Sequence, residues 1–505
     1  MKFWKRLLAI AAGALMLCSV GACGNKTPNS ETDLEIFVWK NGYGVDFIDA
    51  IVAEFKKEYP QYNVILRSSS KDEFASNIEL GARYNSTDLY FTTSPNQTLN
   101  SYLEPLDDVL ASKYKDEEKT IAEKYDPVLL ENFRNSEDGT FVLSYASSYI
   151  GIVYNSEILS DSKVPVTTNQ LIDRSNELKN AKKYPFIHFA TEGYWAYFYP
   201  VWQAQYDGMD YFKKSFLTLT DESGKSPSKE VYLKEDGRRQ ALQVLDDLIQ
   251  PDKVASGSSS QDFTTQQTKF LNSDDIAMMV TGTWLNNEMK SDNDKFKMMK
   301  TPVVSSIIYN PRLDGSIEDD DELAALIAAV DAAPSAEAVP LEGEGYSVTS
   351  KDAKAIYEAR NITYCISDDN GMCIPNYASA KEAAKDFVRF FHSDKAMKIY
   401  EEVMNMPLPY DYSDGSSYDS ADWSEWNKNI LKLRDESIPL MMKVVKKSDI
   451  FLSGGATPYA GLVPIIEFMK ESARPTASDL WTKLTTTINE NWTKYLSNAG
   501  LEEGA

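Results

Sequence analysis

The chain has 505 residues, 43% of them hydrophobic, and carries 76 acidic against 52 basic side chains, a formal net charge of −24. This length exceeds what a single hydrophobic core usually organises, so two or more folded units are expected. The apolar and aromatic content is that of a folded protein. The acidic balance argues against nucleic-acid binding, because contacts with phosphates need a basic surface.

The first 22 residues have the layout of a secretory signal peptide. A short cationic segment with Lys2, Lys5 and Arg6 precedes an uncharged run that ends at Val20. The run is shorter than the about 18 to 20 residues that a stable membrane-spanning helix needs. We therefore expect residues 1–22 to be removed as a signal peptide.

The residues after this run resemble the lipobox of bacterial lipoproteins. "VGAC" places Val20 and two small residues directly before Cys23. The resemblance implies that Cys23 is lipidated, with acyl chains such as palmitate, and becomes the mature N-terminus. The alternative is an ordinary signal peptide with an incidental cysteine. Residues 23–33 are polar and predict a flexible tether at the outer face of the cell membrane.

From residue 34 the pattern alternates between strands and helices. "LEIFVW" predicts a strand, and residues 45–59 carry apolar side chains at helical spacing. "NVILR" predicts a second strand, and "DLYF" a third after a helix-like segment at 74–84. Strands separated by helices predict a parallel sheet covered on both faces.

The same alternation returns after residue 141. "GIVYN", "PFIHF" and "DDIAMMVTG" predict strands, and residues 168–178 and 236–248 predict helices. An acidic segment within residues 302–339 interrupts the pattern and predicts a solvent-facing loop with a short helix whose N-terminus carries acidic residues. Further helices are expected at 381–391, 393–405, 423–447 and 477–496. Two α/β lobes of similar size follow from this pattern.

The remaining cysteines and the histidines favour structural roles. Cys365 and Cys373 flank a polar turn, and both a disulfide and two free buried thiols fit an oxidising exterior. No second Cys or His cluster in the sequence accompanies them, and the turn lacks the ligand spacing of a calcium loop, so no metal site is expected. His188 and His392 lie in apolar segments, and the sequence has no G-x-S-x-G, H-E-x-x-H or P-loop motif.

Several segments together resemble the extracellular solute-binding proteins of family 1, the group that includes the maltose-binding protein of carbohydrate ABC importers. The markers are "VWKNGYG", "STDLYF", "GIVYNSEIL", "IAMMVTGTWLNNEM", "GYSVTSK" and "AAKDFVRFFHSDKAMKIYEEV". The resemblance implies a periplasmic-binding-protein-like α/β fold of two doubly wound lobes that are joined by a hinge, with the ligand between them.

The resemblance also suggests the course of the chain through the two lobes. The N-terminal lobe would contain residues 33–143 and 303–398. The C-terminal lobe would contain residues 150–300 and 400–500 and would end in a helical region. The chain would cross between the lobes near residues 144–149, near Thr301 and near residue 400.

Ligands of open α/β sheets lie beyond the carboxyl ends of the strands. A sugar needs aromatic planes to stack on and amides or carboxylates for its hydroxyls, and such side chains follow the predicted strands. The candidate ligand-binding residues are Trp39, Asn41, Tyr43, Asp88, Glu192, Tyr194, Trp195, Trp284 and Tyr459. One of Tyr194 and Trp195 is expected to face the ligand, and Asp88 alternatively caps or orients a strand. Core packing is the alternative for the other aromatic residues, and Ser148 at the first crossing is a further candidate.

We therefore expect a lipid-anchored receptor on the extracytoplasmic face of the cell membrane. It would capture a carbohydrate, expected to be an oligosaccharide, close around it and deliver it to the permease subunits of an ABC importer. We expect a monomer without a cofactor, a metal or catalytic residues. Two alternatives keep the same cleft: a surface glycan hydrolase, which would need two opposed carboxylates, and a sensory or adhesion lipoprotein.

Overall fold

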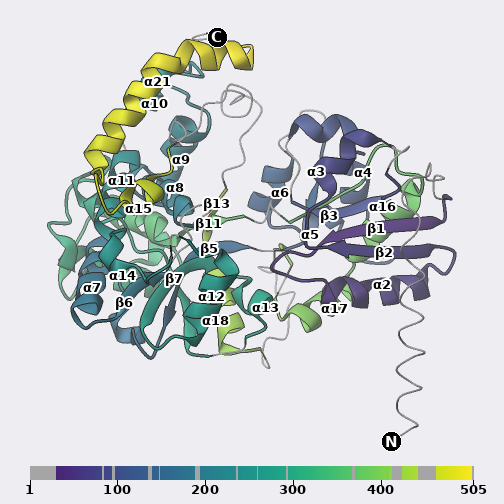
Figure 1. The fold of residues 1–505 in the computed structure, drawn as a ribbon, viewed down its shortest axis with the longest axis horizontal. Helices are drawn as coiled ribbons and strands as arrows, with labels where there is room; N and C mark the ends of the chain where they lie inside the picture. The colour runs from purple at the N-terminus through teal and green to yellow at the C-terminus, as the bar shows by residue number, and fades with distance from the viewer. Residues whose placement is uncertain are drawn as a thin grey trace, which may run out of the picture.

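The computed structural model describes residues 30–81, 85–93, 97–134, 139–146, 148–187, 194–234, 237–258, 260–291, 294–366, 370–406, 408–411, 423–441 and 462–502. These residues form two α/β halves, each built on its own sheet (Figure 1). The predictions for Cys23, His188, Glu192 and Tyr459 lie outside the described residues. Among the described helices, none has the length and apolar character of a membrane span.

The first half is built on a five-stranded sheet in the order β2-β1-β3-β12-β4. β2, β1 and β3 are parallel, as the sequence predicts, whereas β12 runs antiparallel to β3 and to β4. The strands are β1 (Asp33–Trp39), β2 (Asn63–Ser69), β3 (Leu89–Thr92), β4 (Leu143–Ser144) and β12 (Gly371–Cys373). The helices around this sheet are α2 (Asp46–Glu58), α3 (Phe74–Asn77), α4 (Asp107–Leu110), α5 (Ile121–Lys124), α6 (Pro127–Phe133), α16 (Lys381–Phe391) and α17 (Asp394–Met404) (Figure 1).

The second half is built on a six-stranded mixed sheet in the order β13-β11-β5-β7-β6, with β8 also paired to β5. Every residue of the two central strands β5 and β7 is buried, which explains their continuous apolar sequences. The strands are β5 (Tyr149–Asn155), β6 (Tyr184–Ile187), β7 (Ile276–Gly282), β8 (Phe296–Met299), β11 (Ile362–Cys365) and β13 (Ile438–Leu440). A further pair, β9 (Glu342–Gly343) and β10 (Tyr346–Ser347), forms a separate hairpin.

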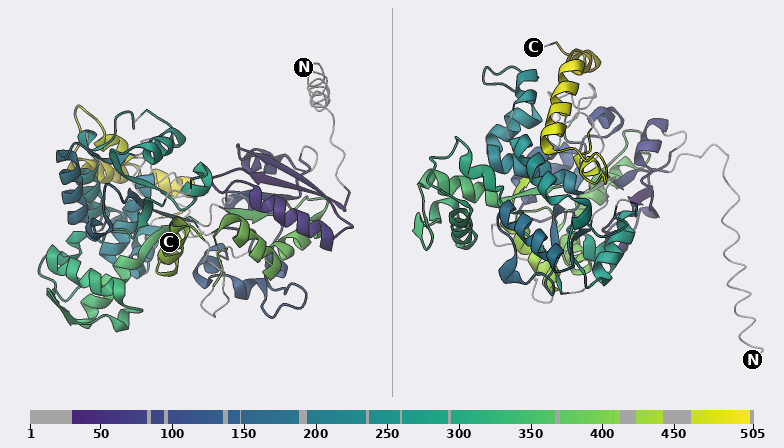
Figure 2. Two further views of the ribbon diagram at one scale, coloured as in Figure 1. Left: turned by 90° about the horizontal axis from the view of Figure 1, so that it is seen from below. Right: turned by 60° about the vertical axis from the view of Figure 1, so that its left-hand side comes forward.

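Helices surround the second sheet, some packed on its strands and others packed on those helices. They are α7 (Thr168–Asn180), α8 (Phe198–Asp207), α9 (Met209–Phe212), α10 (Lys229–Leu233), α11 (Gly237–Leu248), α12 (Phe263–Asn272), α13 (Leu285–Met289), α14 (Asp320–Ala332), α15 (Ser350–Asn361), α18 (Glu425–Asp435), α20 (Pro464–Phe468) and α21 (Ala477–Ala499). The amphipathic helix α21 buries Leu480, Trp481 and Ile488. Figure 2 shows this yellow helix along the outside of the second half. The α/β fold class predicted from the sequence is thereby confirmed.

The chain passes between the two sheets three times: from β4 to β5, from β11 to β12 and from β12 to β13. The third passage lies between α17, which packs on α2, and α18, which packs on β8. The first of these passages lies in the range 144–149 suggested by the sequence. The second differs from the expected crossing near Thr301, because β11 pairs with β5 of the second sheet. The expected assignment of residues 303–398 to one lobe is therefore not matched by the sheets: β11 belongs to the second sheet and β12 to the first.

Hydrogen bonds show why the segment after β8 stays with the second half. The Ser305 amide donates to Thr168 Oγ1 at 2.9 Å, and the Val304 amide donates to Gln205 Oε1 at 2.9 Å. The buried Asp352 carboxylate accepts from the Asp314 amide at 2.6 Å. Long-range polar contacts of this kind leave no periodicity in the sequence, so the hydrophobic pattern could not assign this segment to a sheet.

The acidic segment contains a helix, as the sequence predicts, but α14 is 13 residues long and is not wholly solvent-facing. Asp319 caps α14 by accepting a hydrogen bond from the Glu322 amide at 2.9 Å. Asp320, Asp321 and Glu322 occupy the first turn, where the partial positive charge of a helix N-terminus favours carboxylates. The opposite face of α14 buries Leu326 and its apolar neighbours. The acidic residues therefore stabilise a helix terminus.

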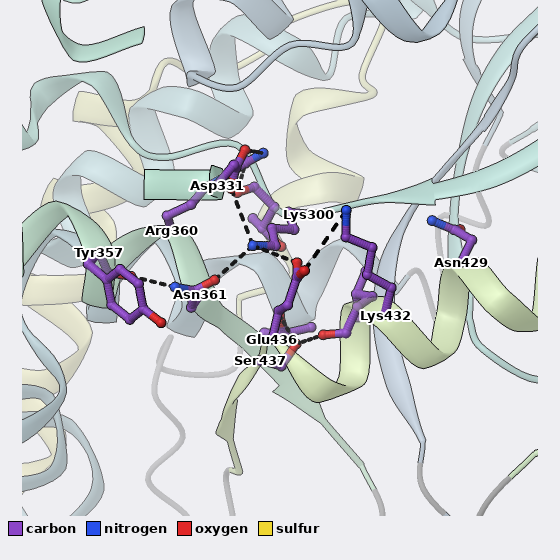
Figure 3. Close-up of polar contacts among 12 residues, drawn as sticks. Lys300, Asp331, Tyr357, Arg360, Asn361, Asn429, Lys432, Glu436 and Ser437 are labelled. Carbon is purple, nitrogen blue, oxygen red and sulfur yellow. Dashed lines mark hydrogen bonds and ion pairs between the residues drawn. The ribbon is translucent and has the colours of Figure 1, made fainter. Parts of the chain in front are cut away.

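A partly buried ionic network joins distant segments of the second half (Figure 3). Arg360 Nε lies 3.0 Å from Asp331 Oδ1, and Arg360 Nη2 lies 2.9 Å from Asp331 Oδ2, a two-pronged arrangement. Lys300 Nζ reaches Asp331 at 3.2 Å, Asn361 Oδ1 at 2.9 Å and Glu436 Oε2 at 2.9 Å. The network thus ties the end of β8 to α14, α15 and the turn after α18.

The helix predicted for residues 423–447 is shorter than expected. α18 ends at Asp435, and the edge strand β13 follows. Ser437 Oγ donates to Thr363 Oγ1 at 2.9 Å, which holds the turn beside β11. Pro439 has no backbone N–H, and an edge strand tolerates it whereas a helix interior does not. Pro439 was the local signal against a continuous helix.

Cys365 and Cys373 are buried thiols that are not joined in a disulfide. Cys365 lies in β11 of the second sheet, and Cys373 lies in β12 of the first sheet. Burial raises the pKa of the Cys373 thiol well above its usual value. Of the two alternatives that the sequence left open, the structure shows two buried thiols without a disulfide.

His392 is a buried packing residue of the first half. Its Nε2 lies 3.3 Å from the Tyr125 hydroxyl, and its Nδ1 contacts the Tyr410 hydroxyl. Burial and the nearby Lys124 ammonium lower the pKa of His392 to about 3. The imidazole is therefore neutral at physiological pH and links α16 to the segment after α17.

Candidate functional site

Side chains from both halves meet where the chain passes between the two sheets. Seven residues, here called the junction cluster, are joined there by hydrogen bonds and ring contacts. They are Asn41, Tyr43, Tyr145, Ser148, Thr283, Trp284 and Asn370. They follow β1, β4 and β7 or precede β5 and β12, so strand ends of both sheets supply them.

Asn41 connects the first strand loop to the passages between the halves. Its Nδ2 donates to the Tyr145 hydroxyl at 3.1 Å and to Asn370 Oδ1 at 2.9 Å. Its Oδ1 accepts from the Tyr43 amide at 2.9 Å, which fixes the loop after β1. Asn370 Nδ2 in turn donates to Ser148 Oγ at 2.9 Å. One amide network thus spans the passage from β4 to β5 and the passage from β11 to β12.

Tyr43 places a hydroxyl between the two halves. Its oxygen lies 2.7 Å from Ser148 Oγ and 3.4 Å from Thr283 Oγ1. Burial raises the pKa of Tyr43 to about 12, although hydrogen bonds from Ser148 and Thr283 oppose the shift. The phenol therefore stays protonated at physiological pH and is available as a donor and an acceptor.

Trp284 packs against the backbone of both halves. A Cβ at Gly42, in the loop after β1, would lie 2.3 Å from Trp284 Cδ1, and a Cβ at Gly282, at the end of β7, would lie 2.0 Å from Cζ3. Only glycine allows the indole this close approach on either side. Tyr194 meets the same indole edge-on, with ring centroids 5.7 Å apart. Trp284 is thus the aromatic centre of the site.

The structure separates the remaining predicted residues. Trp195 is fully buried against Phe186 and Phe198, so of the Tyr194 and Trp195 pair only Tyr194 meets the junction cluster. Trp39, the last residue of β1, is half-buried and donates its indole N–H to the Ser70 carbonyl at 3.3 Å. Trp39 lies next to the cluster in sequence, but its indole N–H forms a hydrogen bond with the loop after β2.

Asp88 lies away from the junction cluster. It is 1% exposed, and its carboxylate accepts from the Glu35 amide at 2.9 Å and from the Ala380 amide at 3.0 Å. Asp88 directly precedes β3, so it lies at the amino end of that strand. The junction cluster lies beyond the carboxyl end of the neighbouring strand β1. The four residues of β3, at ~3.3 Å per residue, separate the two ends of the sheet by about 13 Å. The structure therefore shows the alternative role, in which Asp88 orients a strand and the turn before α16.

Three members of the junction cluster were not singled out in the sequence. Tyr145 lies in the first passage, Thr283 directly precedes Trp284, and Asn370 lies in the turn between the two cysteines. Thr283 had a local signal in its position after β7. Asn370 had none, because only the antiparallel pairing of β12 brings its turn to the end of β4.

All seven side chains of the junction cluster are uncharged, and they combine aromatic rings with hydroxyls and amides. Each amide or hydroxyl can donate and accept hydrogen bonds. Within the described part of the chain, no group of three or more His, Cys, Asp or Glu side chains is arranged to hold a metal ion. The chemistry of the cluster suits a neutral ligand that carries several hydroxyls.

Comparisons with known proteins agree with this architecture. The family model described as "Bacterial extracellular solute-binding protein" matches residues 50–428. A search of curated proteins finds no match.

Solved structures of similar fold include three solute receptors. A probable secreted solute-binding lipoprotein from Streptomyces coelicolor has a TM-score of 0.59 at 13% identity, covering 92% of this chain and 100% of that one. The bacterial solute receptor AcbH, with an exclusive preference for β-D-galactopyranose, has a TM-score of 0.62 at 11% identity and coverages of 92% and 99%. The maltose-maltodextrin binding protein of Alicyclobacillus acidocaldarius has a TM-score of 0.54 at 13% identity and coverages of 90% and 100%. At these identities the likeness shows the fold.

Proposed function

The chain belongs to the family of bacterial extracellular solute-binding proteins, and from this premise we propose that it is a lipid-anchored receptor for a carbohydrate. It captures the sugar at the junction cluster, closes around it and delivers it to the permease subunits of an ABC importer. The observation that carries this proposal is the meeting of an indole, phenols, hydroxyls and amides from both halves at one place.

The absence of charge from the seven cluster side chains supports a neutral ligand. A buried charged ligand would need an opposite charge or a dense set of donors to offset its lost hydration. A sugar instead needs donors and acceptors beside an apolar ring face. The cluster has this chemistry in the Asn41 amide and the Trp284 indole, and a sugar hydroxyl would replace a hydrogen bond that Asn41 makes within the cluster. Two of the similar solved proteins bind β-D-galactopyranose and maltose-maltodextrin. We extend the class of ligand that they share, a saccharide, to this chain, and we propose an oligosaccharide within that class.

Ligand binding at the junction cluster would also explain how the two halves close around the ligand. A ligand shifts the equilibrium between open and closed forms only through contacts that differ between them. In the described structure Tyr43 of the first half bonds to Thr283 of the second half at 3.4 Å. A ligand hydroxyl that exchanges with such bonds contacts both halves at once, so it favours the closed form.

Calorimetry tests the proposal directly. The purified protein is titrated with a panel of mono- and oligosaccharides and with amino acids and peptides as other solute classes. We expect heat of binding with at least one saccharide and with none of the other solutes. Binding of another class alone would contradict the carbohydrate proposal. Release of shortened products from the saccharides would instead indicate the glycan hydrolase alternative.

The lipid anchor is proposed from the lipobox-like "VGAC", which lies outside the described residues. Several acyl chains are needed for stable anchoring, because one chain binds a membrane only reversibly. Cys23→Ser should therefore release the protein from the membrane into the medium with unchanged ligand affinity. Fractionation of cells followed by immunoblotting measures this, with Cys18→Ser as the matched control. Full membrane retention of Cys23→Ser would contradict the anchor.

A further inference from the structure

The loop that follows β1, residues 41–46 and here called the β1 loop, packs against the opposite half of the protein. It contacts residues 283–290, which leave the end of β7 and form α13. Figure 1 shows α13 on the side of the second half that faces the first. The two segments are about 240 positions apart in the sequence, so only the fold brings them together.

Three contacts of different chemistry join the β1 loop to the second half. The Tyr43 hydroxyl lies 3.4 Å from Thr283 Oγ1, and the Tyr43 ring meets the Trp284 indole with centroids 6.3 Å apart. Lys290 Nζ lies 3.7 Å from Asp46 Oδ2, and both of these side chains are exposed. Tyr43 and Trp284 are buried. The exposed ion pair contributes little, so the buried aromatic contact carries most of the attraction.

The β1 loop is held in shape before it meets the second half. Asn41 Oδ1 accepts a hydrogen bond from the Tyr43 amide at 2.9 Å, and the Gly44 amide donates to the Asn41 carbonyl at 3.0 Å. A loop that is already ordered loses little conformational entropy when it packs. The Tyr43 hydroxyl also lies 2.7 Å from Ser148 Oγ, in the passage from β4 to β5. One phenol thus ties the loop to the passage and to the second half.

We propose that the β1 loop is an internal latch that holds the two halves together through protein contacts alone, before any ligand binds. The second step of this inference rests on the proposed function: a saccharide hydroxyl replaces the Tyr43 hydroxyl at Thr283 and takes over the joining of the halves. A latch keeps the open form a minor population. The association of a ligand that enters only the open form is reduced by that fraction. Tyr43 therefore sets how much of the protein is open to a saccharide.

A chemical cross-link measures this contact directly. A water-soluble carbodiimide joins a carboxylate to an amine that lies beside it, so it should form an amide between Asp46 and Lys290 while the halves are together. We call this product the inter-half link. Asp314 and Lys351, 2.8 Å apart within the second half, give the reference link. Mass spectrometry of the digested protein measures the first yield relative to the second, and we expect both links without added saccharide.

Tyr43→Phe should lower the relative yield of the inter-half link to about half or less, because it removes the hydroxyl and its hydrogen bonds but keeps the ring. Gly42→Ala is a second variant, since its Cβ would lie 2.3 Å from Trp284 Cδ1 and push the same loop away. That clash persists around a ligand, so only Tyr43→Phe is tested with saccharide. Tyr62→Phe is the matched control, because its hydroxyl donates to Asp386 Oδ2 at 2.9 Å within the first half.

Addition of a saccharide that binds in the calorimetric panel should restore the inter-half link in Tyr43→Phe. An unchanged link in both Tyr43→Phe and Gly42→Ala would overturn the latch. A wild-type protein that gives the reference link but no inter-half link without saccharide would overturn it as well. If a saccharide binds and does not restore the link, the second step is wrong. If no saccharide binds to the wild type, the proposed function fails, and the yields without saccharide still decide whether the loop holds the halves.

Discussion

Substitution of Gly42 by alanine should separate the two halves at the junction cluster and weaken saccharide binding by at least about tenfold. The added Cβ would lie 2.3 Å from Trp284 Cδ1 and 2.8 Å from Cγ, well inside normal contact. The indole has no room to yield, because its far edge already packs on Gly282. Overpacking of this kind costs about 1 to 3 kcal/mol, and the junction between the halves is where the strain can be released.

The expected separation is measured by small-angle scattering, as an increase in the radius of gyration, and by calorimetry with the best saccharide of the panel. A double-mutant cycle supplies the control. If the clash with the indole is the cause, Gly42→Ala should have little further effect in a Trp284→Ala background. Additive effects of the two substitutions would show that Gly42 acts through its own loop and not through Trp284.

Substitution of Asp331 by alanine should lower the free energy of unfolding of the second half by about 2 to 3 kcal/mol. The change leaves the guanidinium of Arg360, whose side chain is 6% exposed, without its carboxylate partner. Removing one partner of a buried ion pair is strongly destabilising, because the remaining charge has lost both water and its counter-ion. Lys300 keeps Glu436, so part of the network survives.

Urea unfolding followed by circular dichroism measures this loss as a lower midpoint. Lys432→Ala is the matched control, because its 3.9 Å pair with Glu436 is exposed and is worth less than about 1 kcal/mol. Burial alone would raise the pKa of Asp331, but Arg360 and Lys300 hold it below its usual 3.8. The contribution is therefore present above pH 3.8 and is lost as the pH falls further. The difference between wild type and variant should shrink in that range, and a constant difference would contradict the ionic explanation.

The local hydrophobic pattern predicted the strands that are buried along their whole length and the helices that are buried along one face. The apolar run of β7 reads as a central strand because every one of its residues is buried. The spacing in α2 reads as a helix because Phe47, Ile51 and Phe55 face the core together. The sequence also placed the aromatic and amide residues directly after β1 and β7 near a site. The reason is that ligands of open α/β sheets lie beyond the carboxyl ends of the strands.

Residues with several possible partners needed the tertiary structure. Trp195 and Tyr194 are neighbours in one aromatic segment, yet one packs against Phe186 in the core and the other against Trp284. Asp88 carries the same chemistry as a ligand-binding carboxylate, but two backbone amides already occupy it. The chemistry of a side chain determines which hydrogen-bond or packing partners it can have. Only the fold determines which of those partners lie near it.

By itself the sequence determined the α/β class, the family, the central strands and the neighbourhood of Trp284 and Tyr43. Only the tertiary structure decided that Asn370 joins Ser148 and Asn41, that residues 303–366 pack with the second half, and that Cys365 and Cys373 stay apart. The physical reason is the range of the interactions. Periodic burial produces a pattern among residues that are close in the sequence. Hydrogen bonds across two passages of the chain join residues up to 329 positions apart, so they produce no pattern in the local sequence.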